Sequence, residues 1–162
     1  MQIAIIADTH MPKGNRGLPT RCVQHLQTAD LIIHAGDFVR MAILQQLQSY
    51  SQVIAVHGNV DDPEVRKALP ATTELQAGGA TIALIHDAGP AAGRLRRMRR
   101  RFPDADAVIF GHSHIPLHET DEDGFQIFNP GSPTERRRSP RHTMGLARVL
   151  EGSVSFELID LG

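Results

Sequence analysis

The feature of this sequence that most restricts its fold is a short apolar run that occurs five times and stops each time at a polar cluster. The runs cover residues 3–7, 31–35, 53–57, 82–85 and 108–110. The clusters that follow them are Asp8-Thr9-His10, Gly36-Asp37, Gly58-Asn59, His86-Asp87 and Gly111-His112-Ser113-His114. Short apolar runs of this kind are typical of strands that are buried on both faces.

Segments with helical periodicity lie between these runs. They cover residues 19–27, 41–47 and 91–102. Strands that alternate with helices predict βαβ units and a largely parallel sheet, with ligand sites just beyond the carboxyl ends of the strands. All five polar clusters are therefore expected at one edge of the sheet.

After residue 115 the apolar residues alternate with polar ones. Segments 117–120, 125–128, 144–150 and 154–159 predict antiparallel hairpins, and Asp123-Gly124 and Glu151-Gly152-Ser153 supply the turn residues. We therefore expect a second sheet that stacks on the first. The chain has 162 residues, 41% of them hydrophobic, and no repeat or linker, so we place residues 1–162 in a single domain.

The composition narrows the possible partners and location. The formal net charge is −1, so the whole chain has no strong attraction for nucleic acid or anionic membranes. Cys22 is the only cysteine, which excludes an internal disulfide and fits a reducing compartment. No apolar run approaches the roughly 20 residues that span a bilayer, and residues 1–7 lack the features of a secretion signal. We expect a cytoplasmic protein without a membrane partner.

The residue types in the polar clusters suit metal ions. Imidazole suits the borderline transition metals, and a carboxylate suits hard cations and can bridge two ions with its two oxygens. One residue separates Asp8 from His10, so both side chains would point the same way from an extended strand end. His112 and His114 repeat this spacing.

Three glycines precede candidate ligands. Gly36, Gly58 and Gly111 each allow a sharp turn and a close approach of the backbone where a strand meets its loop. Any one cluster has a simpler explanation, because an Asp at a strand end often caps a helix and a His there often lies at the surface. Together, the five clusters indicate a metal site.

In their order and spacing, these blocks resemble those of the calcineurin-like metallophosphoesterase superfamily, and in particular its small bacterial and archaeal phosphodiesterase branch. The resemblance runs nearly from end to end, and Asn129-Pro130-Gly131-Ser132 resembles a late motif of that branch. It implies an α/β fold of two stacked mixed β-sheets flanked by helices, the metallophosphoesterase-like four-layer sandwich.

The resemblance also implies a ligand set for two divalent metal ions. One ion is expected on Asp8, His10, Asp37 and His114, and the second on Asn59, His86, His112 and the bridging Asp37. Manganese is the metal we expect, and iron, zinc, cobalt and nickel suit the same donors. The implied reaction is direct hydrolysis by a hydroxide between the ions, which would lie about 3.5 to 4 Å apart. Asp37, Asn59 and His112 are the residues we expect to be catalytic.

Two positions depart from the family pattern. Val60 stands where many members carry a histidine that is thought to assist the leaving group, so activated or phenol-like esters should be favoured. Asp87 stands where glycine is common. It would either orient a ligand histidine or cap a helix that begins near Pro90.

Two groups of arginines and two further histidines have alternative explanations. The run Arg94, Arg96, Arg97, Arg99, Arg100 and Arg101 predicts an amphipathic helix whose guanidinium groups are solvated or pair with Asp104 and Asp106; the alternative is a patch that binds phosphates. A Pro-rich loop carries Arg136, Arg137, Arg138 and Arg141. One or more of them, with Arg136 and Arg138 as the candidates, either bind a substrate phosphate or lie in a solvated loop. His34 and His57 are expected to be packed near the site and not to bind metal.

We conclude from the sequence that the chain is a metal-dependent phosphoesterase, most specifically a phosphodiesterase, for a small phosphate ester. Two other functions stay open. The first is a non-catalytic scaffold of the same fold, like the metal-poor retromer subunit. The second is a nuclease-like protein that uses the arginine-rich helix, although nucleic acid is not the partner we expect. The sequence does not define an oligomeric state.

Overall fold

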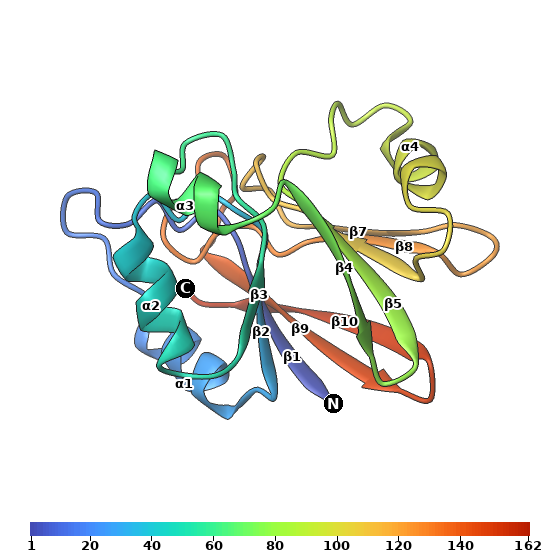
Figure 1. The fold of residues 1–162 in the computed structure, drawn as a ribbon, viewed down its shortest axis with the longest axis horizontal. Helices are drawn as coiled ribbons and strands as arrows, with labels where there is room; N and C mark the ends of the chain where they lie inside the picture. Colours follow the sequence, from blue (N-terminus) through green and yellow to red (C-terminus); the bar gives the residue numbers. More distant parts are fainter.

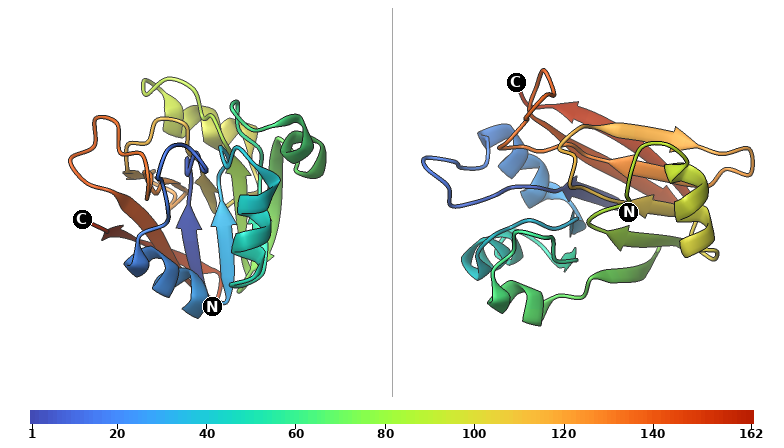
Figure 2. Two further views of the ribbon diagram at one scale, coloured as in Figure 1. Left: turned by 90° about the vertical axis from the view of Figure 1, so that its left-hand side faces the viewer. Right: turned by 90° about the horizontal axis from the view of Figure 1, so that it is seen from above.

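Two five-stranded sheets lie face to face, and helices cover their outer sides (Figures 1 and 2). The computed structural model describes residues 1–162. The helices are α1 (Thr20–Thr28), α2 (Met41–Gln48), α3 (Pro63–Ala68) and α4 (Arg94–Arg101). The strands are β1 (Gln2–Ile6), β2 (Leu31–His34), β3 (Val53–Ala55), β4 (Thr72–Ala77), β5 (Ala80–Ile85), β6 (Ala107–Ile109), β7 (Leu117–Thr120), β8 (Gln126–Asn129), β9 (Thr143–Leu150) and β10 (Ser153–Asp160).

The order of the strands is β10-β9-β1-β2-β3 in the first sheet and β4-β5-β6-β8-β7 in the second. Both sheets are mixed. β1, β2 and β3 are mutually parallel, as are β5, β6 and β8, while β9, β10, β4 and β7 run antiparallel to their neighbours. The predicted four-layer α/β sandwich is confirmed.

Three hydrophobic layers hold the sandwich together. On β1, Ile3 and Ile5 lie in the layer between the sheets, whereas Ala4 and Ile6 pack on the side of α1 and α2. Both faces of β1 are therefore buried, which explains its continuous apolar run. The third layer joins the second sheet to α4 through Met98.

The partition of the strands between the sheets differs from the prediction. We expected the five apolar runs to form one largely parallel sheet, but β5 and β6 belong to the second sheet. The hairpin β9–β10 joins the first sheet, because β9 pairs antiparallel with β1. An apolar run reports burial on two faces, and strands of both sheets share that property, so the pattern does not identify a strand's neighbour.

Two elements were absent from the sequence-based description, and one boundary was wrong. The short helix α3 and the edge strand β4 were not predicted. The third helical segment begins at Arg94 and not at residue 91, after Gly93 in a left-handed conformation (φ +68°). Asp87 does not cap this helix, because its carboxylate accepts a hydrogen bond from the N–H of Gly89 at 2.8 Å.

Candidate metal centre

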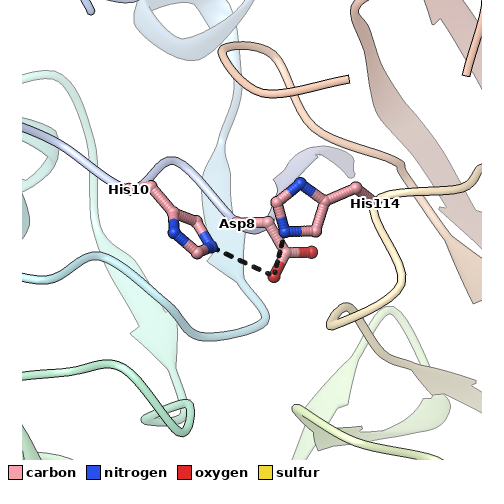
Figure 3. A group of neighbouring side chains, drawn as sticks. All are labelled: Asp8, His10 and His114. Atoms are coloured by element: carbon pink, nitrogen blue, oxygen red, sulfur yellow. Dashed lines mark ion pairs between the residues drawn. The ribbon is translucent and has the colours of Figure 1, made fainter. Parts of the chain in front are cut away.

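The polar clusters that follow β1, β2, β3, β5 and β6 meet at one end of the sandwich. Two groups of side chains there could each hold a metal ion, and in each group the ligand atoms lie within 4.8 Å of one another. The groups are Asp8, His10 and His114, and Asp37, His86 and His112. Figure 3 shows the first group, with the rings of His10 and His114 on either side of the Asp8 carboxylate. Asp8, His10, Asp37 and Asn59 follow strands of the first sheet, and His86, His112 and His114 follow strands of the second.

Asp37 lies between the two groups. Its Oδ2 atom is 3.4 Å from Nε2 of His10 and 3.2 Å from Nε2 of His86. Asn59 closes the second group, since its Oδ1 atom is 3.1 Å from both Nε2 of His86 and Nδ1 of His112. All seven side chains that were expected to bind metal thus converge, and each lies within reach of at least one other.

The backbone at the site adopts an unusual conformation. Asp8, His10, Asp37, His112 and His114 all have positive φ values, between 46° and 70°. The expectation that Asp8 and His10 share a direction because the strand end is extended is therefore wrong. They reach the site from left-handed residues, each of which costs about 1 to 2 kcal/mol for a non-glycine side chain. Hydrogen bonds from the N–H groups of Asp8 and His10 to Gly36 O and Asp37 O, both 3.0 Å, hold this loop.

The three glycines before the candidate ligands allow close packing at the site. A Cβ atom on Gly58 would lie 2.0 Å from Oδ1 of Asp37, and one on Gly111 would lie 2.9 Å from Oδ2 of Asp8. Gly36 would place its Cβ 2.7 Å from the ring of His86, and it also has a positive φ of 93°. The predicted close approach is confirmed at all three positions, whereas the turn needs a positive φ only at Gly36.

Hydrogen bonds orient three of the histidine rings. Nδ1 of His86 is 2.7 Å from Ala35 O, and Nδ1 of His114 is 2.5 Å from Glu135 O. A carbonyl oxygen only accepts, so each Nδ1 carries a proton, and in the neutral ring Nε2 is the atom that remains to bind a cation. Nδ1 of His10 likewise faces an acceptor, since it lies 3.4 Å from Oε2 of Glu135. These contacts direct the Nε2 atoms into the cluster, as metal-binding histidines require.

The donor set fits divalent cations. Oδ2 of Asp8, Nε2 of His10 and Nε2 of His114 are buried and have no hydrogen-bond partner. Buried polar atoms almost always have partners, and a bound cation would satisfy all three. Carboxylates with neutral imidazoles are ligands that suit divalent transition metals.

The local electrostatics agree with this assignment. Burial raises the pKa of Asp8 to about 7, because the nearby rings of His86 and His10 offset only part of its desolvation and the Asp37 carboxylate adds to it. Burial also lowers the pKa of His114 to about 4, which keeps that imidazole neutral and able to bind metal at neutral pH. For Asp37 burial acts to raise the pKa, but the close contacts with the rings of His10 and His86 outweigh it and hold the pKa well below the ordinary value. Asp37 is therefore an anion between the two groups.

The sequence analysis missed two acidic residues that support the site. Asp61 is only 4% exposed and accepts hydrogen bonds from the N–H groups of Asp37, Val39 and Gly58, at 3.0, 2.7 and 2.6 Å. Glu135 contacts His10 and His114, and its Oε2 atom also pairs with Arg16 at 3.1 Å. The available signals were the one carboxylate in Gly58-Asn59-Val60-Asp61 and an acid three residues after Asn129-Pro130-Gly131-Ser132.

Replacing Glu135 with glutamine is expected to weaken metal binding by about 10- to 100-fold, because a carboxylate that faces a metal-bound imidazole raises its basicity and fixes its orientation. Isothermal titration of the metal-free protein with Mn²⁺ measures this change. Glu122→Gln, in the exposed turn before β8, is the matched control and should leave the affinity unchanged. Equal affinities in the two variants would contradict this role for Glu135.

His34 and His57 lie near the centre without entering it. His34 is fully buried, its ring stacks on Phe38 with centroids 3.6 Å apart, and Nε2 is 3.1 Å from Oγ1 of Thr9. Burial lowers its pKa to about 3, so it is a neutral packed residue, as predicted. His57 is half-buried and lines a cavity beside Asn59. Asp87 lies 3.8 Å from Nε2 of His112, which leaves it in position to orient that ring.

The arginines occupy varied environments. Arg136 is exposed, and its guanidinium donates to the carbonyls of Ser139 and Pro140 in its own loop. Arg138 lines a cavity together with Ser113, Ile115 and Arg137. Arg137, from the same loop, donates to His112 O at 3.4 Å.

The arginine-rich segment forms the amphipathic helix that was predicted. Met98 of α4 is buried against the second sheet. Arg94, Arg97 and Arg99 donate to main-chain carbonyls of the neighbouring loops, namely Gly89 O, Ala88 O and Ala105 O. The predicted pairing with Asp104 and Asp106 is wrong, because no ion pair of the chain includes either carboxylate. None of the four helices has the length and apolar character needed to cross a bilayer.

Known proteins with similar sequences and folds indicate the family to which the chain belongs. The chain is 32% identical over 164 residues to a probable metallophosphoesterase of Methanocaldococcus jannaschii, a match that covers 99% of this chain and 82% of that protein. Its fold resembles Vps29 from Entamoeba histolytica solved in complex with Zn²⁺ (TM-score 0.77, 22% identity, all of both chains). It also resembles a structure described as a novel archaeal phosphodiesterase (TM-score 0.73, 20% identity, 98% of this chain and 100% of the other).

The family model for the calcineurin-like phosphoesterase superfamily domain matches residues 1–152. Its match extends over all seven converging side chains and over the Asn129-Pro130-Gly131-Ser132 loop. This chain belongs to the calcineurin-like phosphoesterase superfamily.

Proposed function

We propose that this protein is a phosphodiesterase that hydrolyses a small phosphate ester with two divalent metal ions. The observation that carries the proposal is the position of Asp37, whose Oδ2 atom lies between His10 and His86 at 3.4 and 3.2 Å. A carboxylate with one ligand group on either side is suited to bridging two cations. Residues 1–162 would form a single catalytic domain.

We assign one ion to Asp8, His10, His114 and Asp37, and the other to Asp37, Asn59, His86 and His112. When bound, the two ions would polarise the phosphoryl oxygens and lower the pKa of a water molecule, so that no protein nucleophile is needed. Asn59 links the two histidines of the second group through Oδ1, and His112 stands at the open side of the centre, where a substrate would enter. Mn²⁺ is the metal that we propose.

The residue at position 60 shapes the choice of substrate. Val60 is 41% exposed beside the centre and has no proton to donate to a leaving group. Esters whose leaving groups need no protonation, such as phenolates, are therefore favoured.

The two competing functions have less support. A scaffold that had lost catalysis would have no need for seven converging ligands with three buried unpartnered donor atoms. A nuclease-like protein would use the whole run of six arginines on α4, yet three of them, Arg94, Arg97 and Arg99, bind main-chain carbonyls.

Metal-stripped protein is expected to be inactive, and Mn²⁺ should restore hydrolysis of bis(nitrophenyl) phosphate more than that of the nitrophenyl monoester. The measurement is release of nitrophenolate by protein treated with chelator, with Mn²⁺, Fe²⁺, Zn²⁺, Co²⁺ and Ni²⁺ added back in turn. Activity that is indifferent to both chelator and metal would refute the proposal.

We also propose that Arg136 and Arg138 bind a substrate phosphate. Arg138 lines a cavity beside Ser113, which supports this proposal. The guanidinium of Arg136 already donates to a carbonyl of its own loop, so we expect Arg136 to contribute less to phosphate binding than Arg138. Arg138→Ala is expected to raise the Michaelis constant for a diester about tenfold, with a smaller rise for Arg136→Ala. Steady-state kinetics that give unchanged Michaelis constants for both variants would remove these residues from the site.

A further inference from the structure

A cavity of about 280 Å³ opens directly beside the second ligand group. Asn59 and His86 form part of its wall, so it is continuous with the proposed metal centre. The remaining lining comes from the loop after β3, from α3, from the segment that leads into β4, from the end of β5 with its loop, and from the end of α4. Its charged side chains are Arg66, Asp87 and Arg101.

Two arginines from separate elements line this cavity. Arg66 of α3 is fixed in place, because Nε donates to Asp61 O at 2.9 Å and a terminal N–H donates to Asn59 O. The side chain of Arg101, at the end of α4, makes no hydrogen bond to the protein, and its guanidinium carbon lies 5.8 Å from the centre of the Phe102 ring. Neither arginine takes part in an ion pair. The chain therefore leaves two positive charges without a carboxylate partner at a cavity that adjoins the proposed metal centre.

The single carboxylate in the cavity wall belongs to the metal side. Asp87 lies 3.8 Å from Nε2 of His112 and accepts the N–H of Gly89. More than 4 Å separates it from both guanidinium groups, since no ion pair joins them. The other charged residues of the lining are thus basic, and a guanidinium group binds the oxygens of a phosphate or carboxylate with paired hydrogen bonds.

We infer that this cavity binds the non-reacting part of the substrate and that this part carries a second anionic group, a phosphate or a carboxylate, held by Arg101 and Arg66. The inference rests on the proposed function and names the substrate class: an anionic small-molecule phosphate ester. A volume of about 280 Å³ lies just below the usual range of small-molecule sites, about 300 to 1,000 Å³, and suits a group of a few carbon atoms with one anion.

The test compares three ligands that cannot be hydrolysed. They are propylphosphonate and two analogues that carry a carboxylate or a second phosphonate on the far carbon of the chain. Isothermal titration of Mn²⁺-loaded protein is expected to show roughly tenfold or tighter binding of at least one analogue relative to propylphosphonate. The two analogues distinguish a carboxylate from a phosphate as the preferred group.

Arg101→Gln removes one charge and is expected to abolish this preference while leaving the affinity for propylphosphonate within about twofold of the wild type. Arg100→Gln is the matched control, because it makes the same change on the same helix outside the cavity lining, and it should keep the preference. Arg66 is unsuitable for the test, since it also holds the main chain of Asn59.

Equal binding of all three ligands by wild-type protein, or the same loss of preference in both arginine variants, would overturn the inference and leave the metal centre intact. A protein that takes up no Mn²⁺ would overturn both proposals, because the cavity would then adjoin no reactive centre.

Discussion

Asp37→Asn is expected to reduce kcat/KM for a nitrophenyl diester by roughly 10³-fold, which corresponds to about 4 kcal/mol of transition-state stabilisation. Oδ1 of Asp37 accepts the N–H of Val60 at 3.0 Å, so asparagine can keep this bond with its carbonyl oxygen. Its amide nitrogen then takes the place of Oδ2, facing His10 and His86. The substitution removes the one anion between the two proposed ions with little change in shape, and their mutual repulsion is no longer offset.

Two measurements separate this effect from misfolding. Titration with Mn²⁺ should show weaker uptake by Asp37→Asn, and thermal unfolding in the presence of chelator should show a folded protein. Asp123→Asn, in the exposed turn before β8, makes the same chemical change away from the site and should match the wild type in every assay. Full activity of Asp37→Asn would eliminate a bridging carboxylate from the mechanism.

Asp61→Ala is expected to destabilise the metal-free protein by about 3 kcal/mol or more. Three buried N–H groups, those of Asp37, Val39 and Gly58, would lose their acceptor, and each unsatisfied buried donor costs about 1 to 3 kcal/mol. In a protein of this size the melting temperature should fall by roughly 10 °C. Calorimetry in the presence of chelator measures the change without any contribution from bound metal.

The neighbouring residue provides the control for this prediction. Asp62 is 39% exposed in its side chain and pairs with Arg40 at 3.4 Å, so Asp62→Ala should change the stability by no more than about 0.5 kcal/mol. If the two alanine variants unfolded at the same temperature, Asp61 would not be the residue that joins the loops after β2 and β3.

Much of the site could be predicted because each candidate ligand follows an apolar run directly. The runs fix where strands end, and parallel strands bring their carboxyl ends to one edge. Asp8, Asp37 and His112 were placed together for this reason, although Asp37 and His112 come from different sheets.

The rest depended on long-range contacts that no local pattern records. β5 and β6 belong to the second sheet because β5 pairs with β6 and β6 pairs with β8, over separations that hydrophobic periodicity does not report. The left-handed conformations of Asp8 and His10 are imposed by hydrogen bonds to the loop after β2. Likewise, Asp61 looked like an ordinary loop carboxylate, and only the fold shows that three N–H groups surround it.

The division of the ligands between the two sheets has a consequence for folding. Each proposed ion would clamp the open end of the sandwich, because its ligands reach it from both layers. The layers could not separate at that end without releasing the cations, so metal concentration would act directly on the unfolding equilibrium, by about 2.7 kcal/mol for an ion present at one hundred times its dissociation constant. The same ions would then serve catalysis and hold the two sheets together, so a shortage of metal would lower the stability of the fold as well as the activity.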